Sequence, residues 1–468
     1  MGLGINLYHK LPTPLRSVVA SSRGFYLRWW RYDSETETLV DEALERDNWT
    51  ADQWNSWRED SVSRLLERAA TATPYYLSLV KDRAFDWRSL SNWPVLEKSV
   101  LRNDGRRFIA NDCNASRMFH DHTSGTTGSS LDIWLRRETV KRWYALFEAR
   151  ARRWYGVSRH DRWAILGGQV VVPVNRRRPP FWVWNAGLNQ LYLSAYHLSP
   201  RLMESYLDAL VRYRVEYLIG YPSAMYQLAL AALITKRKDV RFKVAVTNAE
   251  PVYDYQRSAI QEAFNCPVRE TYGMAEIAAA ASECERGSLH QWPEVGVLEV
   301  EDSGSDGSGE FICTGLLNLD MPLIRYRVGD RGKLSDLQCA CGRQLPVIEK
   351  VEGRNDDVLI TRDGRAVGRL DPIFKGDLKI DEAQIIQNSL TDVLVKLVPA
   401  IGFGPQQKAI LTDRIRERLG DMRVEVQTVD AIPRTNRGKF RAVICNLPSE
   451  VRREIERDRM ANGAGGGR

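Results

Sequence analysis

The chain has 468 residues, of which 43% are hydrophobic and 27% are charged, as is typical of a folded globular protein. At about 150 residues per domain, this length predicts roughly three domains, with a core large enough to need no disulfide bonds. The net charge of +7 is a mild bias that suits binding to phosphates or to an anionic surface. The arginine clusters are scattered and belong to no recognisable nucleic-acid-binding module, so the composition does not favour a nucleic-acid partner.

We expect a cytoplasmic protein. The beginning of the sequence lacks the long apolar segment of a signal peptide, and no stretch approaches the roughly 18 apolar residues of a membrane span. The chain has seven cysteines, an odd number. In a reducing compartment, a cluster of cysteines indicates metal binding rather than disulfide bonds.

The predicted elements divide the chain into three regions and a tail. Residues 1–95 are predicted to be helical and to belong to the large domain. Within them, the aromatic and basic residues 25–30 either rest on a membrane surface or pack onto the large domain. Residues 96–353 are predicted to form the main part of the large domain, residues 354–460 a small α+β domain, and the glycine-rich residues 461–468 a disordered tail.

Strands and helices alternate in the large domain. Short apolar runs predict buried strands at 215–219, 244–246 and 268–271, and helical periodicity predicts helices at 201–214, 224–234 and 252–264. Such alternation indicates an α/β domain with a mostly parallel sheet. The small domain is predicted to contain strands at 357–360, 393–398 and 424–429 and a helix at 406–419.

A loop rich in glycine and hydroxyl side chains, TSGTTGSS at 123–130, precedes a predicted strand at 131–135. Glycines let the backbone approach a triphosphate and direct N–H groups towards it, and hydroxyls add further donors. Considered alone, such a loop is as often an ordinary turn. It lacks the GK[ST] sequence of a Walker A motif, so a P-loop NTPase is disfavoured.

Two further turns follow predicted strands. Residues 248–251 (NAEP) follow one strand, and residues 272–276 (YGMAE) follow the next and are predicted to open a helix. Ligands of open α/β sheets bind at the carboxyl ends of strands, so both turns are candidate ligand sites. Three more motifs follow along the chain, at 321–330 (MPLIRYRVGD), 352–357 (EGRNDD) and 432–439 (IPRTNRGK).

With these six motifs in this order, residues 93–447 resemble the adenylate-forming superfamily. The resemblance is to the phenylacetate–coenzyme A ligase branch and its CapK-type relatives, which are found in capsule-polysaccharide gene clusters. It implies an acyl-CoA synthetase-like fold, in which a large N-terminal domain binds ATP and a carboxylate and a small C-terminal lid domain is mobile. The hinge between the two domains corresponds to Asp356.

The resemblance assigns nucleotide-binding roles residue by residue. The phosphate-binding loop corresponds to Thr123, Ser124, Gly125, Thr126, Thr127 and Gly128. The adenine site corresponds to Ala249, Glu250, Pro251, Tyr272, Gly273 and Met274. Asp330 corresponds to the aspartate that accepts hydrogen bonds from the ribose hydroxyls.

Three residues have catalytic roles by the same resemblance. Glu276 corresponds to an acid that helps to bind Mg²⁺, Arg354 to an arginine that contacts the nucleotide, and Lys439 to a lysine that reaches the adenylation site from the lid. Adenylation joins a carboxylate to the α-phosphate of ATP while pyrophosphate leaves, so it depends on positioning and charge neutralisation. A lysine on a mobile domain completes the site only on closure.

Two features depart from the family pattern. Ser129 stands where the phosphate loop often ends with lysine, which weakens neutralisation of the phosphates, and residues 367–376 differ from those of aryl–coenzyme A ligases. The acyl acceptor is therefore open between coenzyme A, the phosphopantetheine of a carrier protein, and a hydroxyl or amine of a sugar. The carboxylate is unidentified, and position alone suggests that His197, Tyr221, Pro222 and residues 167–169 line its pocket.

A second constellation consists of Cys284, His290, Cys339 and Cys341. Three thiolates and one imidazole suit tetrahedral Zn²⁺, and Gly342 helps the chain to turn around a metal. Its distance in sequence from the phosphate loop indicates a structural clip within the large domain. The alternative is four unrelated residues, because this spacing is less diagnostic than paired CxxC motifs.

The leading hypothesis is ATP- and Mg²⁺-dependent activation of a carboxylic acid as its acyl-adenylate, with transfer to a thiol or another acceptor, in cell-envelope polysaccharide biosynthesis. An alternative enzyme would place AMP on a small molecule. A hypothesis of a different class is a nucleotide-binding protein of polysaccharide assembly without catalytic activity. No nucleic acid is expected, membrane contact would be peripheral, and the oligomeric state is open, a dimer included.

Overall fold

The computed structural model describes residues 7–80, 86–122, 131–173, 176–198, 200–250, 252–301, 307–351, 359–362, 366–367, 370–374, 378–433, 443–448 and 450–451. The N-terminal region is helical, as predicted. Its helices include α2 (Thr13–Arg31), α3 (Thr36–Arg46), α4 (Ala51–Ala72) and α5 (Pro74–Leu79), and α6 (Lys98–Asp104) follows. Among the described residues, no helix has the length and apolar composition that crossing a membrane requires.

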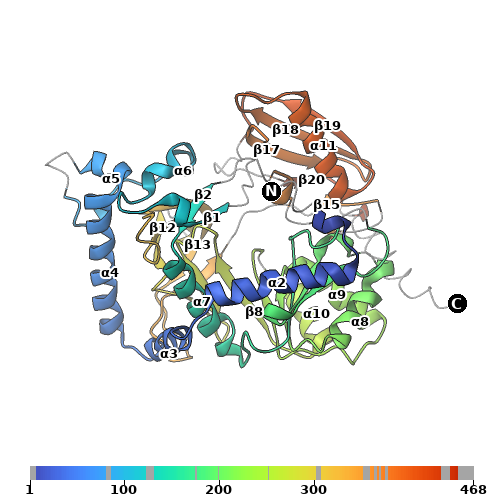
Figure 1. Ribbon diagram of the computed structural model, residues 1–468, viewed down its shortest axis with the longest axis horizontal. Helices are drawn as coiled ribbons and strands as arrows, with labels where there is room; N and C mark the ends of the chain where they lie inside the picture. The colour runs from blue at the N-terminus through green and yellow to red at the C-terminus, as the bar shows by residue number, and fades with distance from the viewer. Residues whose placement is uncertain are drawn as a thin grey trace.

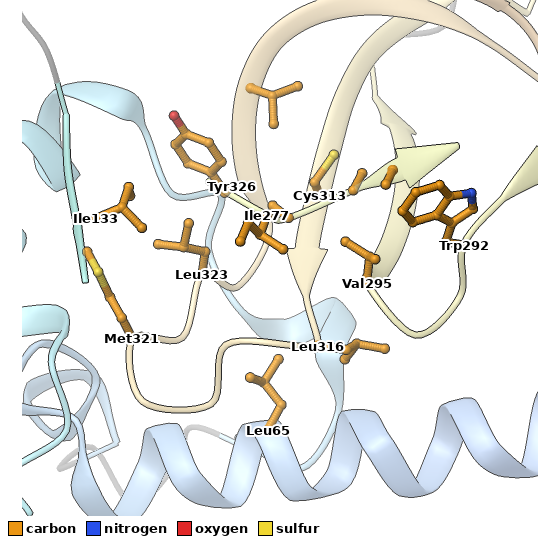
Figure 2. Packing of buried hydrophobic residues seen from close by; sticks show 14 of the residues in the cluster. Leu65, Ile133, Ile277, Trp292, Val295, Cys313, Leu316, Met321, Leu323 and Tyr326 are labelled. Atoms are coloured by element: carbon orange, nitrogen blue, oxygen red, sulfur yellow. The ribbon is translucent and has the colours of Figure 1, made fainter. Parts of the chain in front are cut away.

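Helix α4 covers one end of the large core. It begins with a capping box, in which the Gln53 N–H donates to the Thr50 hydroxyl and the Thr50 N–H donates to the Gln53 side chain. Its inner face carries the fully buried Leu65, which belongs to the main hydrophobic cluster. In Figure 2, Leu65 points from the helix towards Leu316 and the loop that carries Met321.

A twelve-stranded sheet forms the centre of the large domain, and part of it follows the predicted alternation (Figure 1). Its five parallel strands are, in spatial order, β5 (Gln190–Ser194), β3 (Trp163–Gly167), β6 (Tyr217–Gly220), β7 (Val244–Thr247) and β8 (Val268–Gly273). The intervening helices are α8 (Met203–Arg212), α9 (Pro222–Ile234) and α10 (Asp254–Phe264). Helices pack against these strands, which explains their nearly continuous apolar sequences.

The remainder of the sheet is antiparallel, so the expectation of mostly parallel pairing is wrong there. At one edge, β4 (Trp182–Asn185) pairs antiparallel with β5. Beyond β8 the order is β9 (Ala280–Glu283), β10 (Leu289–Gln291), β14 (Val347–Val351), β13 (Tyr326–Ser335), β12 (Gly309–Gly315) and β11 (Gly296–Glu301).

The helix predicted to open at 272–276 is also absent. Gly273 ends β8, and the chain turns back into β9 with Ile277 at a φ of 54° and its N–H donating to the Met274 carbonyl at 3.1 Å. Residues 278–281 are four alanines, which favour helix in isolation. They are instead fully buried beside β8, where pairing with a neighbouring strand outweighs helix propensity.

A separate four-stranded sheet lies in the C-terminal part, drawn in orange and red in Figure 1. Its order is β19 (Arg423–Thr428), β18 (Asp392–Pro399), β17 (Ile380–Gln387) and β20 (Val443–Cys445), and α11 (Pro405–Leu419) packs on it. The strands predicted at 393–398 and 424–429 and the helix at 406–419 are therefore present. The domain boundaries, including the division at 353, stay predictions.

One contact joins this sheet's helix to the large domain. The guanidinium of Arg418 on α11 lies over the ring of Tyr196, 5.3 Å from its centroid. Tyr196 follows β5 and is itself buried. The C-terminal part thus touches the large domain beside the end of a parallel strand.

A buried ion network ties the N-terminal helices to the sheet. Arg150, on α7 (Arg137–Ala151), is fully buried and donates hydrogen bonds to Asp47 at 2.9 Å and to both oxygens of Glu294 at 2.5 and 2.9 Å. Burial disfavours ionisation of Glu294, but the charges of Arg150 and Arg46 outweigh burial, so the pKa of Glu294 lies below its ordinary value. The folded state therefore favours the ionised network.

We predict that Arg150→Met destabilises the protein by about 3–5 kcal/mol at neutral pH, because it removes the buried cation that Asp47 and Glu294 share and leaves Glu294 with Arg46 alone. Because the pKa of Glu294 is lower in the folded chain, the network stabilises fully above about pH 4.5 and loses this contribution as the pH falls through the lower folded value. Denaturant unfolding of Arg150→Met should therefore show a weaker acid dependence than wild type.

The matched control is Arg237→Met, which removes a surface arginine paired with Asp208 and Asp239. Exposed pairs contribute about 0–1 kcal/mol, so this variant should unfold almost like wild type. Equal losses for the two variants would contradict a stabilising role for the buried network.

Candidate adenylation site and metal cluster

The two predicted adenine-site turns, one after β7 and one at the end of β8, lie at the same edge of the sheet. Strands β6, β7 and β8 run parallel in register, with Gly220 opposite Thr247 and Thr247 opposite Glu270, so their carboxyl ends lie together. The turn after β7 reaches the turn after β6, where the Ser223 N–H donates to the Glu250 carboxylate at 3.2 Å. Ala249, which lies between Asn248 and Glu250 in the turn after β7, adopts a left-handed φ of 67°.

Asp330 and Tyr272 meet, although 58 residues separate them in sequence. The hydroxyl of Tyr272, at the end of β8, donates to Oδ2 of Asp330 on β13 at 3.0 Å. Gly273 and Met274 follow Tyr272 directly, at the end of the strand. The structure thus brings the predicted ribose ligand to the predicted adenine turn.

Glu276 lies nearby and is almost buried, at 7% exposed. Its Oε1 accepts a hydrogen bond from the Tyr326 hydroxyl at 3.0 Å and lies 3.6 Å from Nζ of Lys98. Both contacts use the same oxygen, so among the described residues Oε2 remains available to a cation. The pKa of the Cys313 thiol is raised by burial and then by the negative charges of Asp330 and Glu276. Both carboxylates therefore lie near the Cys313 side chain.

Lys98 is a residue that the motifs did not reveal. It begins α6 and stands in no glycine-rich or charged pattern, so only its contact with Glu276 identifies it. Glu270 is a second such residue. Burial, and then the charge of Glu283, raises the pKa of the Glu270 carboxyl to about 7, which places a titratable group on β8 two residues before Tyr272.

The described residues fit an adenine nucleotide in one further respect. Oδ1 of Asn248, in the turn after β7, is shielded from solvent and accepts no hydrogen bond from any described residue. A buried acceptor without a donor is costly, and an exocyclic amino group would supply that donor. The same turn carries Ala249 and Glu250, which the resemblance assigns to the adenine site.

Several predicted residues lie outside the described part of the chain. They are Thr123, Ser124, Gly125, Thr126, Thr127 and Gly128 of the phosphate loop, together with Pro251, Arg354, Asp356 and Lys439. The strands that flank the loop are described: β1 (Phe119–His122) and β2 (Asp132–Leu135) pair antiparallel, with His122 opposite Asp132. The two ends of the loop are therefore held together, while the roles of its residues stay predictions.

Tyrosine side chains surround Gly168, in the segment suggested for the acid pocket. The Tyr196 hydroxyl donates to the Gly168 carbonyl at 2.5 Å, and a Cβ placed on Gly168 would lie 2.9 Å from the Tyr221 hydroxyl oxygen. His197, also suggested from its position, is buried and contacts Ser194 and the Pro173 carbonyl. The lining of the acid pocket stays a prediction.

The predicted metal ligands come together in a cluster. One ligand atom from each of Cys284, His290, Cys339 and Cys341 lies within 4.8 Å of all the others. The sulfurs of Cys284 and Cys339 are 3.7 Å apart, and Nε2 of His290 is 3.3 Å from the Cys341 sulfur. A tetrahedral ion with Zn–S distances of about 2.3 Å holds its sulfur ligands about 3.8 Å apart.

The surroundings of His290 also suit a metal ligand. Its Nδ1 lies 3.3 Å from the Leu345 carbonyl, so an N–H at Nδ1 leaves the Nε2 lone pair directed into the cluster. Burial lowers the pKa of His290, which favours the neutral ring. The donor set therefore fits Zn²⁺, and it would join Cys284 after β9 and His290 on β10 to the loop between β13 and β14.

Comparisons with known proteins show which proteins this chain is similar to. The chain is 27% identical to Protein CapK of Staphylococcus aureus over 368 residues, which is 77% of this chain and 81% of that protein. Residues 359–446 match the CapK C-terminal domain family. The chain is also 26% identical to a phenylacetate–coenzyme A ligase of Thermus thermophilus, over 71% of this chain and 75% of that protein.

The similarity to CapK and the phenylacetate–coenzyme A ligases is confirmed. Among solved structures, 2-hydroxyisobutyryl-CoA ligase in its thioesterification state matches with a TM-score of 0.54 and 19% identity, over 89% of this chain and 94% of that one. The fold is that of the adenylate-forming ligases.

We predict that the purified chain contains about one equivalent of zinc, because four donors in tetrahedral reach bind this ion tightly. Elemental analysis after dialysis should show this content, and Cys341→Ser should lower it severalfold and lower the melting temperature. Cys266→Ser, which removes a buried thiol outside the cluster, is the control. Zinc at wild-type level in Cys341→Ser would contradict coordination by the cluster.

Proposed function

We propose that this chain activates a carboxylic acid as its acyl-adenylate with ATP and transfers the acyl group to the thiol of coenzyme A. The observation that carries this proposal is the placement of Asp330 and Glu276. Each carboxylate is held by a tyrosine hydroxyl at 3.0 Å, close to the turns that end the parallel strands. The similarity to phenylacetate–coenzyme A ligases along 71% of the chain supports the same reaction.

Among the described residues, different side chains would bind the adenine and the ribose of ATP. Asn248 offers a shielded acceptor for the adenine amino group, and Asp330 offers carboxylate oxygens to the ribose hydroxyls. Tyr272 fixes the position of Asp330, since its hydroxyl donates a hydrogen bond to Oδ2. These contacts would hold the α-phosphate in one position, which is the main requirement for in-line attack.

Glu276 and Lys98 form the charged part of the proposed site. Glu276 would hold Mg²⁺ through Oε2, and the ion supplies charge neutralisation for the phosphates when bound. Lys98, at 3.6 Å from Glu276, adds a fixed positive charge on the large domain. This charge is relevant because Ser129 replaces the lysine that often ends the phosphate loop.

We further propose that Lys439 completes the adenylation site and that the zinc cluster is structural rather than catalytic. Two of its ligands, Cys284 and His290, are fully buried, so the cluster offers little access to a substrate. A role in cell-envelope polysaccharide biosynthesis, which the resemblance to the CapK-type relatives implies, is part of the same proposal. A carrier protein or a sugar as acceptor and AMP transfer to a small molecule are the competing functions.

The experiment that tests this function follows pyrophosphate release. The purified protein with Mg-ATP and a panel of aryl and short-chain carboxylates should release pyrophosphate only with an accepted acid. Coenzyme A should raise the rate of pyrophosphate release. One free thiol of coenzyme A should be lost for each pyrophosphate released. Acid-dependent release that is indifferent to thiols would favour another acceptor, and release without any acid would favour AMP transfer to a small molecule.

The matched pair of variants is Lys439→Ala and Lys408→Ala, both in the C-terminal region. Lys408 is exposed on α11, so its removal should leave the rate unchanged. Removing a positive charge that acts only in the transition state typically costs about 10²–10³ in rate, which is the loss we expect for Lys439→Ala. Absence of both ATP binding and pyrophosphate release in wild type would support the non-catalytic hypothesis.

Asp330→Ala should raise the KM for ATP by about tenfold or more while the chain stays folded, because loss of a charged hydrogen-bond acceptor removes about 1.5–3 kcal/mol. Tyr272→Phe should show a smaller increase, since it releases Asp330 without removing it. Asp336→Ala, an exposed aspartate six residues further on, is the control. A KM for ATP unchanged in Asp330→Ala would exclude this residue from the nucleotide site.

A further inference from the structure

Helix α2 exposes an apolar stripe on the outside of the molecule. Seven of the thirteen large hydrophobic side chains that are exposed in the described chain lie within residues 7–29. Six of them stand on α2 and are between 45% and 64% exposed: Leu15, Val18, Val19, Phe25, Tyr26 and Trp29. At 3.6 residues per turn they fall on one face about 120° wide, interrupted only by Ser22. Figure 1 shows α2 in blue, running along the surface that faces the viewer.

The opposite face of α2 is already fixed to the protein. Gly24 is buried against β4, where any Cβ would collide with the Asn185 side chain, and Gly187 packs against the backbone of Phe25. The Ala186 N–H donates to the Ser21 hydroxyl at 3.0 Å. Small residues thus seat the helix, and the stripe cannot turn inward without breaking these contacts.

The charge of this segment is one-sided. Residues 7–32 contain Lys10, Arg16, Arg23, Arg28 and Arg31 and no aspartate or glutamate. Lys10 and Arg23 are exposed, so positive charge accompanies the apolar stripe at the surface. The first acid, Asp33, is paired with Lys141.

A hollow of about 320 Å³ adjoins the C-terminal end of the stripe. Its lining includes Arg28, Trp29, Arg159 and His160, besides Asp33 and two further aromatic residues. The Arg159 guanidinium also lies over the Tyr32 ring at 4.7 Å and pairs with Glu37. The guanidinium groups of Arg28 and Arg159 thus border this hollow, and guanidinium groups are favoured partners of phosphate.

We propose that α2 is an interfacial helix, which docks the protein on the surface of an anionic lipid bilayer. Apolar and aromatic side chains on one face, with basic residues beside them, are the combination that binds the boundary between headgroups and acyl chains. Trp29 and Tyr26 have the amphipathic rings enriched at that depth. The basic residues attract anionic lipids over distances of about one Debye length.

Charge separates this partner from a second copy of the chain. Two copies joined through α2 would bring two acid-free, basic segments together, and the repulsion would oppose burial of the stripe. An anionic bilayer has the opposite charge and a large apolar interior. The inference does not depend on the proposed adenylation, because vesicle binding needs neither ATP nor an acid.

The test is co-sedimentation of the full chain with vesicles of phosphatidylglycerol and phosphatidylcholine, and with vesicles of phosphatidylcholine alone. We expect binding to the anionic vesicles, at least tenfold weaker binding to neutral ones, and weaker binding at high salt. The triple variant Phe25→Ser, Tyr26→Ser, Trp29→Ser should lose at least tenfold in affinity. The control variant Leu337→Ser, Ile401→Ser alters two side chains that are 81% and 99% exposed elsewhere and should bind like wild type.

A charge-reversed variant separates the two contributions without altering the apolar stripe. The double variant Lys10→Glu, Arg23→Glu should weaken binding to anionic vesicles but not to neutral ones. The control variant Lys238→Glu, Lys408→Glu reverses two exposed charges elsewhere and should weaken binding to anionic vesicles less. Equal binding by wild type and the triple serine variant would overturn the proposal. The proposal would also be overturned if light scattering showed that the wild type is a dimer that does not bind vesicles, while the triple serine variant is a monomer.

Discussion

Strand β8 is the constraint on which the rest of the large domain depends. It pairs parallel with β7 on one side and antiparallel with β9 on the other, so the sheet changes its character across this single strand. The chain must therefore leave its β–α alternation where β8 ends, at Tyr272 and Gly273. This break lets β13, from far along the sequence, bring Asp330 to Tyr272. The candidate site exists because two sheet architectures meet at one strand end.

Much of the parallel half could be predicted from sequence, because buried strands between helices have continuous apolar runs. Helices α9 and α10 and strands β7 and β8 lie close to their predicted ranges. The antiparallel half could not be predicted in this way. Its pairings join residues distant in sequence, and the alanine run at 278–281 carries a local preference for helix that pairing with β8 overrides.

The candidate site shows the same division. Sequence motifs predicted Asp330, Glu276 and the four cysteine and histidine residues of the cluster, because these residues stand in recognisable patterns around glycine, proline or cysteine. Lys98 became visible only through its contact with Glu276, and the pairing of Tyr326 with Glu276 could not be predicted, although Tyr326 stands in the motif at 321–330. Neither residue lies near Glu276 in sequence, and a lysine at a helix start has no distinguishing local pattern. Contacts that span 50 residues or more follow from topology alone.

The contact between Arg418 and Tyr196 connects the C-terminal part of the chain to the segment suggested for the acid pocket. Arg418 belongs to the C-terminal sheet's helix, and the Tyr196 hydroxyl holds the Gly168 carbonyl beside Tyr221. A rotation of the C-terminal part would separate the Arg418 guanidinium from the Tyr196 ring. Tyr196 also contacts Gly168, in the segment suggested for the acid pocket. If the C-terminal part moves as the resemblance implies, its position and the shape of the suggested acid pocket would depend on each other through this one contact.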